Sequence, residues 1–301
     1  MITFVSAAYG AFYREFALRG LCNSFSRYVP NGQLVIFVDD SPGWEAPKNC
    51  EFRLMPESVN NFLSGSDDSF FARTCIKYDL MKTGVAGKKE GVCWIDADSL
   101  VLGDLLSIID ESKINVVSHG SCNPDEEFDC GNGVVVEGRE FAIGGIFYLP
   151  NQKYVSDLMA LALQRSNWKP EPSAYWYSDG EQSLLNHVVQ SNPEEVVWLD
   201  DSGMIANWEF LEKRHPYPFD KGISSISHSN GFFYSNNKRF ALLSWSSLTL
   251  RRHIKQGFRS LNPQVARIFR DDFYGIKSGP YPVLLQYLYT AYDLLNLGKT
   301  R

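Results

Sequence analysis

Residues 91–105 read GVCWIDADSLVLGDL, in which the apolar run Val92–Ile95 leads into two carboxylates one residue apart, Asp96 and Asp98. A continuous apolar run of this length is typical of a strand buried on both faces, and Ala97 is small enough to let a ligand approach. Ligands of open α/β sheets bind at the carboxyl ends of the strands, where both acids would lie. A divalent cation such as Mn²⁺ or Mg²⁺ would offset the repulsion between them. The pattern therefore predicts a metal site; the alternative is an acidic turn, since isolated D-x-D triplets are common.

Strand-like and helix-like segments alternate on both sides of this stretch. Apolar runs predict strands, and apolar residues at helical spacing predict the helices between them. We expect strands at 2–8, 33–38, 50–55, 92–95, 114–118, 142–150 and 196–199, and helices at 12–28, 72–83 and from 152. Such β-α-β alternation predicts an α/β fold with a mostly parallel sheet flanked by helices.

Composition and cysteine usage are those of an ordinary soluble globular protein. The 301 residues are 44% hydrophobic, enough for one large core or two small ones. No apolar run reaches the roughly 18 residues of a spanning helix, and the first residues lack a signal-peptide pattern, so a cytoplasmic location is expected. The six cysteines contain no CxxC pair and are interpreted as reduced thiols, with Cys122 and Cys130 the only plausible pair.

The net charge of −6 hides an asymmetry along the chain. Between Lys221 and Arg270 there are nine Lys or Arg and no Asp or Glu. This asymmetry suggests that the later part meets a polyanion or an anionic surface; alternatively, the two halves attract each other.

Two further features could serve a phosphorylated ligand near the acidic strand. Arg73 and Lys77 lie one turn apart on the expected helix before it, so both could grip a diphosphate; the alternative is a pair of surface charges. Gly144 and Gly145 interrupt a strand-like segment, and paired glycines indicate a bulge or a close approach of another molecule to the backbone.

Two later segments have competing interpretations. Ser178 and Glu181 fit a capping box at the start of a helix, just after three aromatic residues that could stack on a sugar. His228 ends a short strand and is either a hydrogen-bonded structural residue or a metal ligand.

The order of these pieces resembles a glycosyltransferase of the GT-A fold, most closely the family 8 group that includes glycogenin and bacterial lipopolysaccharide galactosyltransferases. The ordered set covers roughly residues 1–240 and is more specific than any one motif. Its members are the first-strand segment Ser6, Ala7, Ala8 and Tyr9, then Arg73 and Lys77, Asp96-Ala97-Asp98, Gly144-Gly145, Glu181-Gln182 with Asn186, and His228 with Gly231 and Lys238. The chain departs from the family pattern at Ala8, where the first strand usually carries Asp, and at Glu181, which stands in place of Asp.

The resemblance implies a function and a set of site residues. Asp96, Asp98 and His228 would hold Mn²⁺ or Mg²⁺ against the phosphates of a nucleotide sugar, with UDP as the expected nucleotide. Residues 6–9, Asp39 or Asp40, Arg73, Lys77, Gly144, Gly145 and Lys238 would bind the donor, and Glu181 or Gln182 would face the anomeric carbon. Transfer to a glycan or lipid-linked acceptor, with retention, is the expected reaction.

Other classes of protein fit parts of this pattern. A haloacid-dehalogenase-like phosphatase also uses D-x-D after an apolar strand, although its nucleophile strand usually comes early in the domain. A nucleotidylyltransferase shares the fold but has a first loop rich in Gly and Arg, and a non-catalytic carbohydrate-binding protein would keep the aromatic residues without a metal. No G-x-G-x-x-G follows a strand, which disfavours a dinucleotide oxidoreductase, and no nucleic-acid partner is expected.

Residues 241–301 are expected to form a basic, aromatic, helical extension of the catalytic domain 1–240. Basic residues are interleaved there with apolar ones, and a helix is expected after Pro280 that suits an interface rather than a bilayer span. The extension could attach the protein peripherally to the anionic inner face of a membrane, or pack on the catalytic domain.

Overall fold

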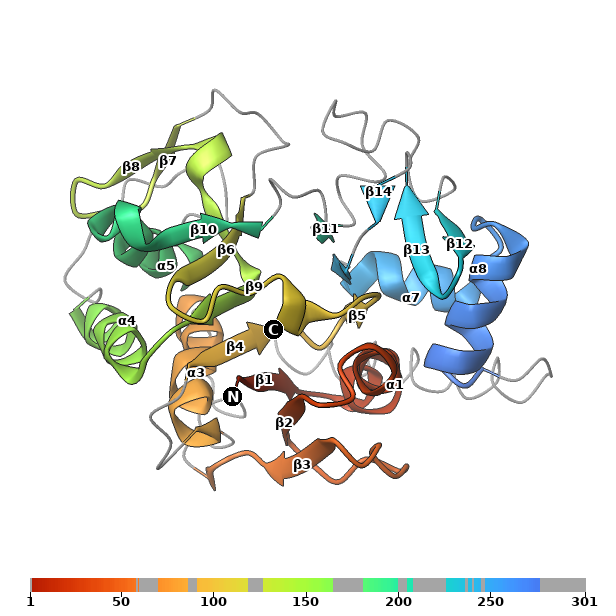
Figure 1. The fold of residues 1–301 in the computed structure, drawn as a ribbon. Coiled ribbons are helices and arrows are strands. Elements are labelled where there is room, and N and C mark those ends of the chain that lie inside the picture. The colour runs from red at the N-terminus through yellow and green to blue at the C-terminus, as the bar shows by residue number, and fades with distance from the viewer. Residues whose placement is uncertain are drawn as a thin grey trace.

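A computed structural model describes residues 2–57, 59, 70–85, 91–118, 127–164, 181–199, 205–207, 226–235, 238–239, 241–244 and 247–276. Its centre is a seven-stranded sheet in the order β10-β6-β9-β4-β1-β2-β3 (Figure 1). The strands are β1 (Thr3–Ala8), β2 (Gln33–Val38), β3 (Cys50–Leu54), β4 (Val92–Ile95), β6 (Ile114–Ser118), β9 (Ala142–Leu149) and β10 (Val196–Trp198). Each was predicted within about two residues.

All neighbouring strands of this sheet run parallel except β9, which is antiparallel to both β4 and β6. The predicted mostly parallel sheet is confirmed. The inversion at β9 brings the glycine pair of that strand alongside the end of β4, because Ile95 pairs with Ile146.

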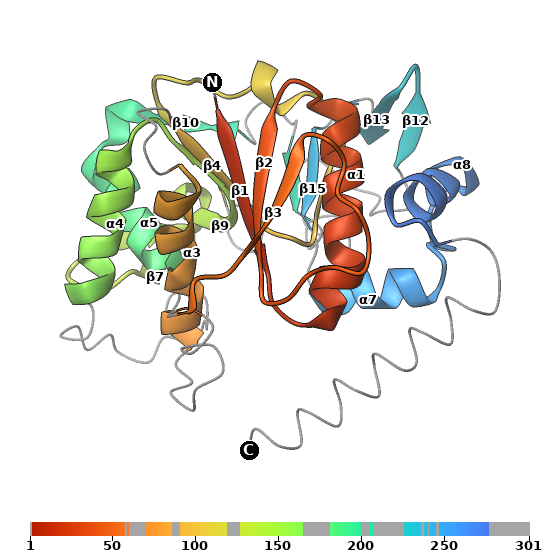
Figure 2. The same cartoon turned by 90° about the horizontal axis from the view of Figure 1, so that it is seen from below.

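Helices cover both faces of the sheet (Figure 2). One face carries α3 (Phe70–Gly84), α4 (Gln152–Gln164) and α5 (Glu181–Ser191), and the other carries α1 (Leu18–Tyr28). The alternation of side chains along a strand explains the two cores, since Phe4 and Ile95 join the cluster of α1 whereas Val5 and Trp94 join that of α3.

The first helix runs without a break from residue 11 to residue 28, close to the predicted range 12–28, but its beginning is not regular α-helix. Tyr13–Ala17 (η1) is a π-helical turn that leads into α1, and the Leu18 amide donates to the Tyr13 carbonyl five residues earlier. Single π turns of this kind occur often near functional sites.

Smaller elements complete the described fold. They are β5 (Ser99–Val101), η2 (Leu105–Ser107), the hairpin β7 (Glu127–Asp129) and β8 (Val135–Glu137), η3 (Gly138–Glu140), η5 (Pro193–Glu195), β11 (Ile205–Asn207), β12 (Ser227–Ser229), β13 (Phe232–Ser235), β14 (Lys238–Arg239), β15 (Leu242–Ser244), α7 (Ser247–Lys255), α8 (Pro263–Arg267) and η8 (Ile268–Phe273).

The chain after residue 240 packs on the first part of the protein. Strand β15 pairs antiparallel with β5, directly after the acidic motif, and Leu250, Phe258 and Phe269 share one apolar cluster with Phe12 and Leu100. The expected division at residue 240 stays a prediction, and the helix expected after Pro280 lies outside the described residues. Among the described helices none is long and apolar enough to span a bilayer, and the five described cysteines form no disulfide.

Candidate active site

Strand β4 delivers the two acids of the D-x-D motif to its carboxyl end. The Asp96 amide donates to the Gly145 carbonyl at 2.8 Å, and the Ser99 amide donates back to the Asp96 carbonyl at 3.1 Å, which fixes a tight turn between β4 and β5. Within this turn Ala97 is buried, the Asp98 residue is 8% exposed and the Asp96 side chain is 37% exposed. The more accessible acid is therefore Asp96, with Asp98 behind it.

Burial makes negative charge unfavourable above all at Asp98, the less exposed of the two acids. It raises the pKa of Asp98 well above its usual range, the nearby Asp96 adds to this, and a hydrogen bond with Tyr13 opposes it. The pKa of Asp96 is also raised, first by burial, although Lys77 and a hydrogen bond from Trp94 lower it. A bound cation would relieve this cost, so the chemistry of the pair suits a divalent metal.

Lys77 of α3 lies at the centre of the site. Its Nζ donates to Glu181 Oε1 at 2.5 Å and to the Gly144 carbonyl at 3.1 Å, and lies 3.9 Å from Asp96 Oδ1 and 5.3 Å from the centre of the Trp94 ring. Burial alone would lower the pKa of Lys77, but Glu181 and Asp96 outweigh it and the pKa is raised. Lys77 is therefore a buried ammonium ion held between two carboxylates.

Glu181 and Gln182 begin helix α5 and both contact the glycine strand or its neighbours. The Gly144 amide donates to Gln182 Oε1 at 3.1 Å, and the Tyr78 hydroxyl donates to the Glu181 carbonyl at 2.7 Å. Glu181 is 5% exposed. Ser178, its expected capping partner, lies outside the described residues, and the Glu181 carboxylate forms an ion pair with Lys77.

A side chain at position 144 would collide with this group. A Cβ there would lie 2.5 Å from Glu181 Oε1 and 3.1 Å from Lys77 Nζ. Gly144 thus lets the ion pair lie directly against the backbone of β9, as expected for a close approach at paired glycines.

The expected nucleotide-binding residues of β1 and β2 lie at the same edge of the sheet. Ser6, Ala7 and Ala8 are the last three residues of β1, and Tyr9, which follows them, is 45% exposed. The Ser6 hydroxyl is buried and has no hydrogen-bond partner in the described part of the chain.

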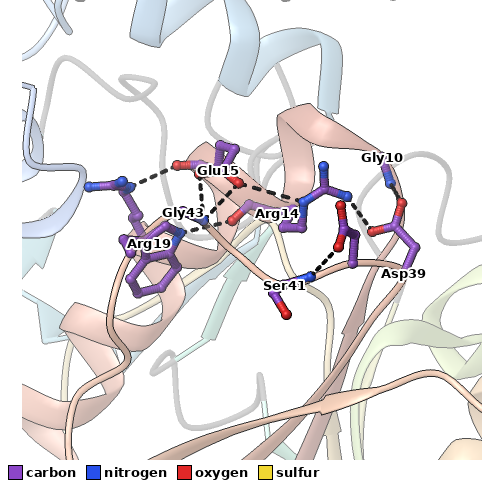
Figure 3. A network of polar contacts seen from close by, with 9 residues as sticks. Gly10, Arg14, Glu15, Arg19, Asp39, Ser41 and Gly43 are labelled. Atoms are coloured by element: carbon purple, nitrogen blue, oxygen red, sulfur yellow. Dashed lines mark hydrogen bonds and ion pairs between the residues drawn. The ribbon is translucent and has the colours of Figure 1, made fainter.

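Asp39 is held in a polar network that joins the loops after β1 and β2 (Figure 3). Its Oδ1 accepts from Arg14 Nη1 at 2.7 Å and its Oδ2 from the Gly10 amide at 3.0 Å. Asp40 instead accepts from the Ser41 amide at 2.8 Å. Asp39 therefore fixes the loop that carries Tyr9.

Three expected site residues are not seen in contact with Lys77: His228 lies in another sheet, and only the backbone of Arg73 and Lys238 is described. His228 lies in the separate sheet of β12, β13 and β14, where it contacts the Phe233 ring at 4.7 Å. Both of its ring nitrogens are buried and lack a hydrogen-bond partner among the described residues, and burial, with a contribution from Arg27, lowers its pKa. Lys238 of β14 pairs with Ser235 of β13, and Arg73 lies in α3. The side chains of Lys238 and Arg73 are outside the described part of the chain.

The described residues contain no group of three His, Cys, Asp or Glu side chains that could hold a metal. Asp96 and Asp98 alone fit a cation of the Mg²⁺ or Mn²⁺ type, which is commonly bound by one or two carboxylates together with substrate phosphates.

Several residues of the site were not predicted from the sequence. Trp94 was assigned only to the buried strand, although strand alternation puts its side chain on the same face as that of Asp96 two residues later. Tyr13 and Tyr78 carried no motif. Asn186 belongs to the helix-start motif, but its two-way bond with the Ala142 backbone, which anchors α5 to β9, could not be read from spacing.

Comparisons with known proteins identify the fold. No family model matches the chain, and no curated protein matches its sequence. The solved structure of the galactosyltransferase LgtC, in complex with donor and acceptor sugar analogues, is similar over 95% of this chain and 100% of that one, with a TM-score of 0.57 at 13% identity. The apo structure of the bifunctional glycosyltransferase WbbM aligns over 69% of this chain and 40% of that one, with a TM-score of 0.45 at 18% identity. The α/β architecture of this protein is thus the GT-A fold of glycosyltransferases.

Proposed function

We propose that this protein is a metal-dependent glycosyltransferase. It would move a sugar from a nucleotide sugar, with UDP as the expected nucleotide, to a glycan or lipid-linked saccharide, with retention at the anomeric carbon. The observation that carries the proposal is the buried ion pair of Lys77 and Glu181, which lies beside Asp96 and against the bare backbone of Gly144, at the ligand-binding edge of a GT-A fold.

Asp96 and Asp98 would hold the cation; His228, the third ligand expected from the sequence, is not grouped with them among the described residues. When bound, the metal would neutralise charge that builds on the diphosphate leaving group. The raised pKa values of both acids support this assignment, because a site built for a cation is electrostatically strained without one.

The residues around Lys77 would bind and orient the donor. Lys77, with Arg73 and Lys238, adds positive charge near the phosphates, and residues 6–9 with Asp39 bind the nucleoside. Lys77 holds the Glu181 side chain by an ion pair, so that its carboxylate could stabilise positive charge on the sugar ring in the transition state. Gln182 is tied to Gly144 and would orient the hydroxyl groups of donor or acceptor.

The structure favours this activity over two of the alternatives. In a haloacid-dehalogenase-like phosphatase the nucleophile strand usually comes early in the domain, whereas here β1, β2 and β3 precede the strand that ends at Asp96. A carbohydrate-binding protein has no need of two neighbouring carboxylates, in which Asp96 raises the pKa of the buried Asp98.

A panel of nucleotide sugars, each with Mn²⁺, Mg²⁺ or EDTA, tests the proposal. We expect metal-dependent release of UDP from one UDP-sugar, and thermal stabilisation by UDP with Mn²⁺, since a ligand at 100 times its Kd stabilises by about 2.7 kcal/mol. Hydrolysis of phosphate monoesters would indicate the phosphatase. Binding of free sugars without metal or nucleotide would indicate the carbohydrate-binding protein.

The acceptor could be reached from a membrane surface. Arg252, Lys255 and Arg259 are exposed on and just after α7, in a stretch without acidic residues. These three basic residues would make a peripheral, salt-sensitive contact with anionic lipid at the inner side of a membrane.

A further inference from the structure

Trp94 contacts both charged groups of the candidate site. Its indole Nε1–H donates to Asp96 Oδ1 at 2.6 Å, and the Lys77 ammonium lies 5.3 Å from the centre of its ring. Since Trp94 and Asp96 are two residues apart at the end of one strand, their side chains leave the sheet on the same face. The rest of the ring is buried in the apolar cluster of α3, and the residue is 4% exposed.

The two oxygen atoms of Asp96 therefore have different surroundings. Oδ1 accepts from the indole and faces Lys77 at 3.9 Å, whereas no hydrogen bond or ion pair from the described residues reaches Oδ2. The Asp96 side chain is 37% exposed, so its second oxygen remains accessible to a ligand. A buried indole has one donor and few rotamers, which fixes the orientation of the carboxylate it serves.

We infer that Trp94 is a positioning residue, which ties Oδ1 of Asp96 and presents Oδ2 to the cation while its ring face holds the Lys77 ammonium. Trp94 thus orients both the carboxylate that would hold the cation and the ammonium beside it. This inference rests on the proposed function, because it assumes that Asp96 binds a cation. Partners that orient a metal ligand in this way usually contribute 10–100-fold to metal affinity or activity.

Trp94→Phe tests the inference, because phenylalanine keeps an aromatic ring in the strand and removes the N–H donor. Trp198→Phe is the matched control, since Trp198 lies in strand β10 of the same sheet and packs against the same apolar cluster. The readouts are the Kd of Mn²⁺ in the presence of UDP, by titration followed with electron paramagnetic resonance, and the Tm without ligand. We expect Trp94→Phe to weaken Mn²⁺ binding by roughly 10–100-fold, and Trp198→Phe to leave it within about twofold of the wild type.

A second variant separates orientation from packing. Replacement of Trp94 by 3-benzothienylalanine keeps the bicyclic ring and exchanges the N–H for sulfur, so the cavity that phenylalanine could leave is avoided. The inference requires this variant to keep the wild-type Tm and to lose Mn²⁺ affinity as Trp94→Phe does. Wild-type Mn²⁺ affinity in a folded benzothienyl variant would overturn it. If the wild type itself bound neither Mn²⁺ nor UDP, the proposed function would fall, and the two failures are therefore distinct.

Discussion

At the scale of single residues, Lys77 and Glu181 form a buried ion pair, in which Glu181 is the nearer of the two carboxylates that face the ammonium. Removing one member of a buried pair leaves an uncompensated charge, which costs about 3–5 kcal/mol. Lys77→Met and Glu181→Gln should therefore each lower the free energy of unfolding by about that amount, measured by urea denaturation.

The double variant Lys77→Met/Glu181→Gln is the informative companion. With both charges gone, we expect stability to recover to well above that of either single variant, because neutral groups of similar size are often tolerated in place of a buried pair. Sugar transfer should not recover. Strictly additive losses of stability in the double variant would show that the two side chains do not depend on each other.

Among the structural elements, strand β9 holds the ion pair in place through the missing side chain of Gly144. Gly144→Ala would push a methyl group against Glu181 Oε1, and overpacking of this kind costs roughly 1–3 kcal/mol. Shortening the neighbour should relieve the clash, so Gly144→Ala is expected to lower the Tm less in the Glu181→Asp background than in the wild type. Calorimetry of the wild type, the two single variants and the double variant measures this coupling, and an equal loss of Tm in both backgrounds would contradict it.

Helix α7 carries His253, whose titration makes the stability of the fold depend on pH. Burial, with a smaller effect of Arg252, lowers the pKa of this imidazole to about 4, and Nδ1 lies 3.2 Å from Ser260 Oγ. The unfolded chain binds a proton below its ordinary pKa of about 6.5, whereas the folded protein does not until about pH 4. Stability should therefore fall as the pH drops from about 6.5 towards 4, by on the order of 3 kcal/mol from this group.

His253→Gln removes the titrating group and keeps a side chain able to bond Ser260. The wild type should lose more stability than this variant on acidification over that window, as followed by urea unfolding at several pH values. Parallel curves for the two proteins would mean that His253 titrates alike in the folded and unfolded chains.

The elements were easier to predict than the contacts between them. Val92–Ile95 could be predicted as a buried strand because a strand with one face in solvent would alternate apolar and polar residues, whereas these four are all apolar. The position of Asp96 and Asp98 at the end of the strand followed from where this apolar run stops. The Lys77–Glu181 pair joins residues 104 positions apart, which no local periodicity encodes. The antiparallel direction of β9 and the π turn before α1 likewise depend on tertiary packing rather than on the residues alone.

On the scale of the whole molecule, the charge asymmetry predicts attachment to an anionic surface. Each basic residue near such a surface contributes about 1 kcal/mol, so substituting Arg252, Lys255 and Arg259 by Gln should abolish sedimentation with anionic liposomes at low salt. The matched control changes Lys48, Lys82 and Lys153, three exposed lysines of the first part of the chain, to Gln. Equal losses in both triple variants, or no binding by the wild type, would contradict a dedicated membrane face.

The fold of the whole molecule brings the candidate site residues together at one edge of the central sheet. The carboxyl ends of β1, β2 and β4, which are neighbours in the sheet, bring residues 6–9, Asp39 and the D-x-D acids to one edge, and β9 with α5 brings Gly144 and Glu181 to it from the other side. One donor molecule could therefore span residues that are far apart in the sequence.

The central claim is that this edge binds a nucleotide through a metal held by the two acids, and calorimetric titration of UDP tests it most directly. We predict that wild-type protein binds UDP with Mn²⁺ and loses most of that affinity in EDTA. Asp98→Asn, which keeps the shape of the side chain and its contact with Tyr13, should remain folded. Its affinity for UDP, with or without Mn²⁺, should be as low as that of the wild type in EDTA. Equal UDP affinity in Mn²⁺ and EDTA, or unchanged metal-dependent binding by Asp98→Asn, would contradict the account.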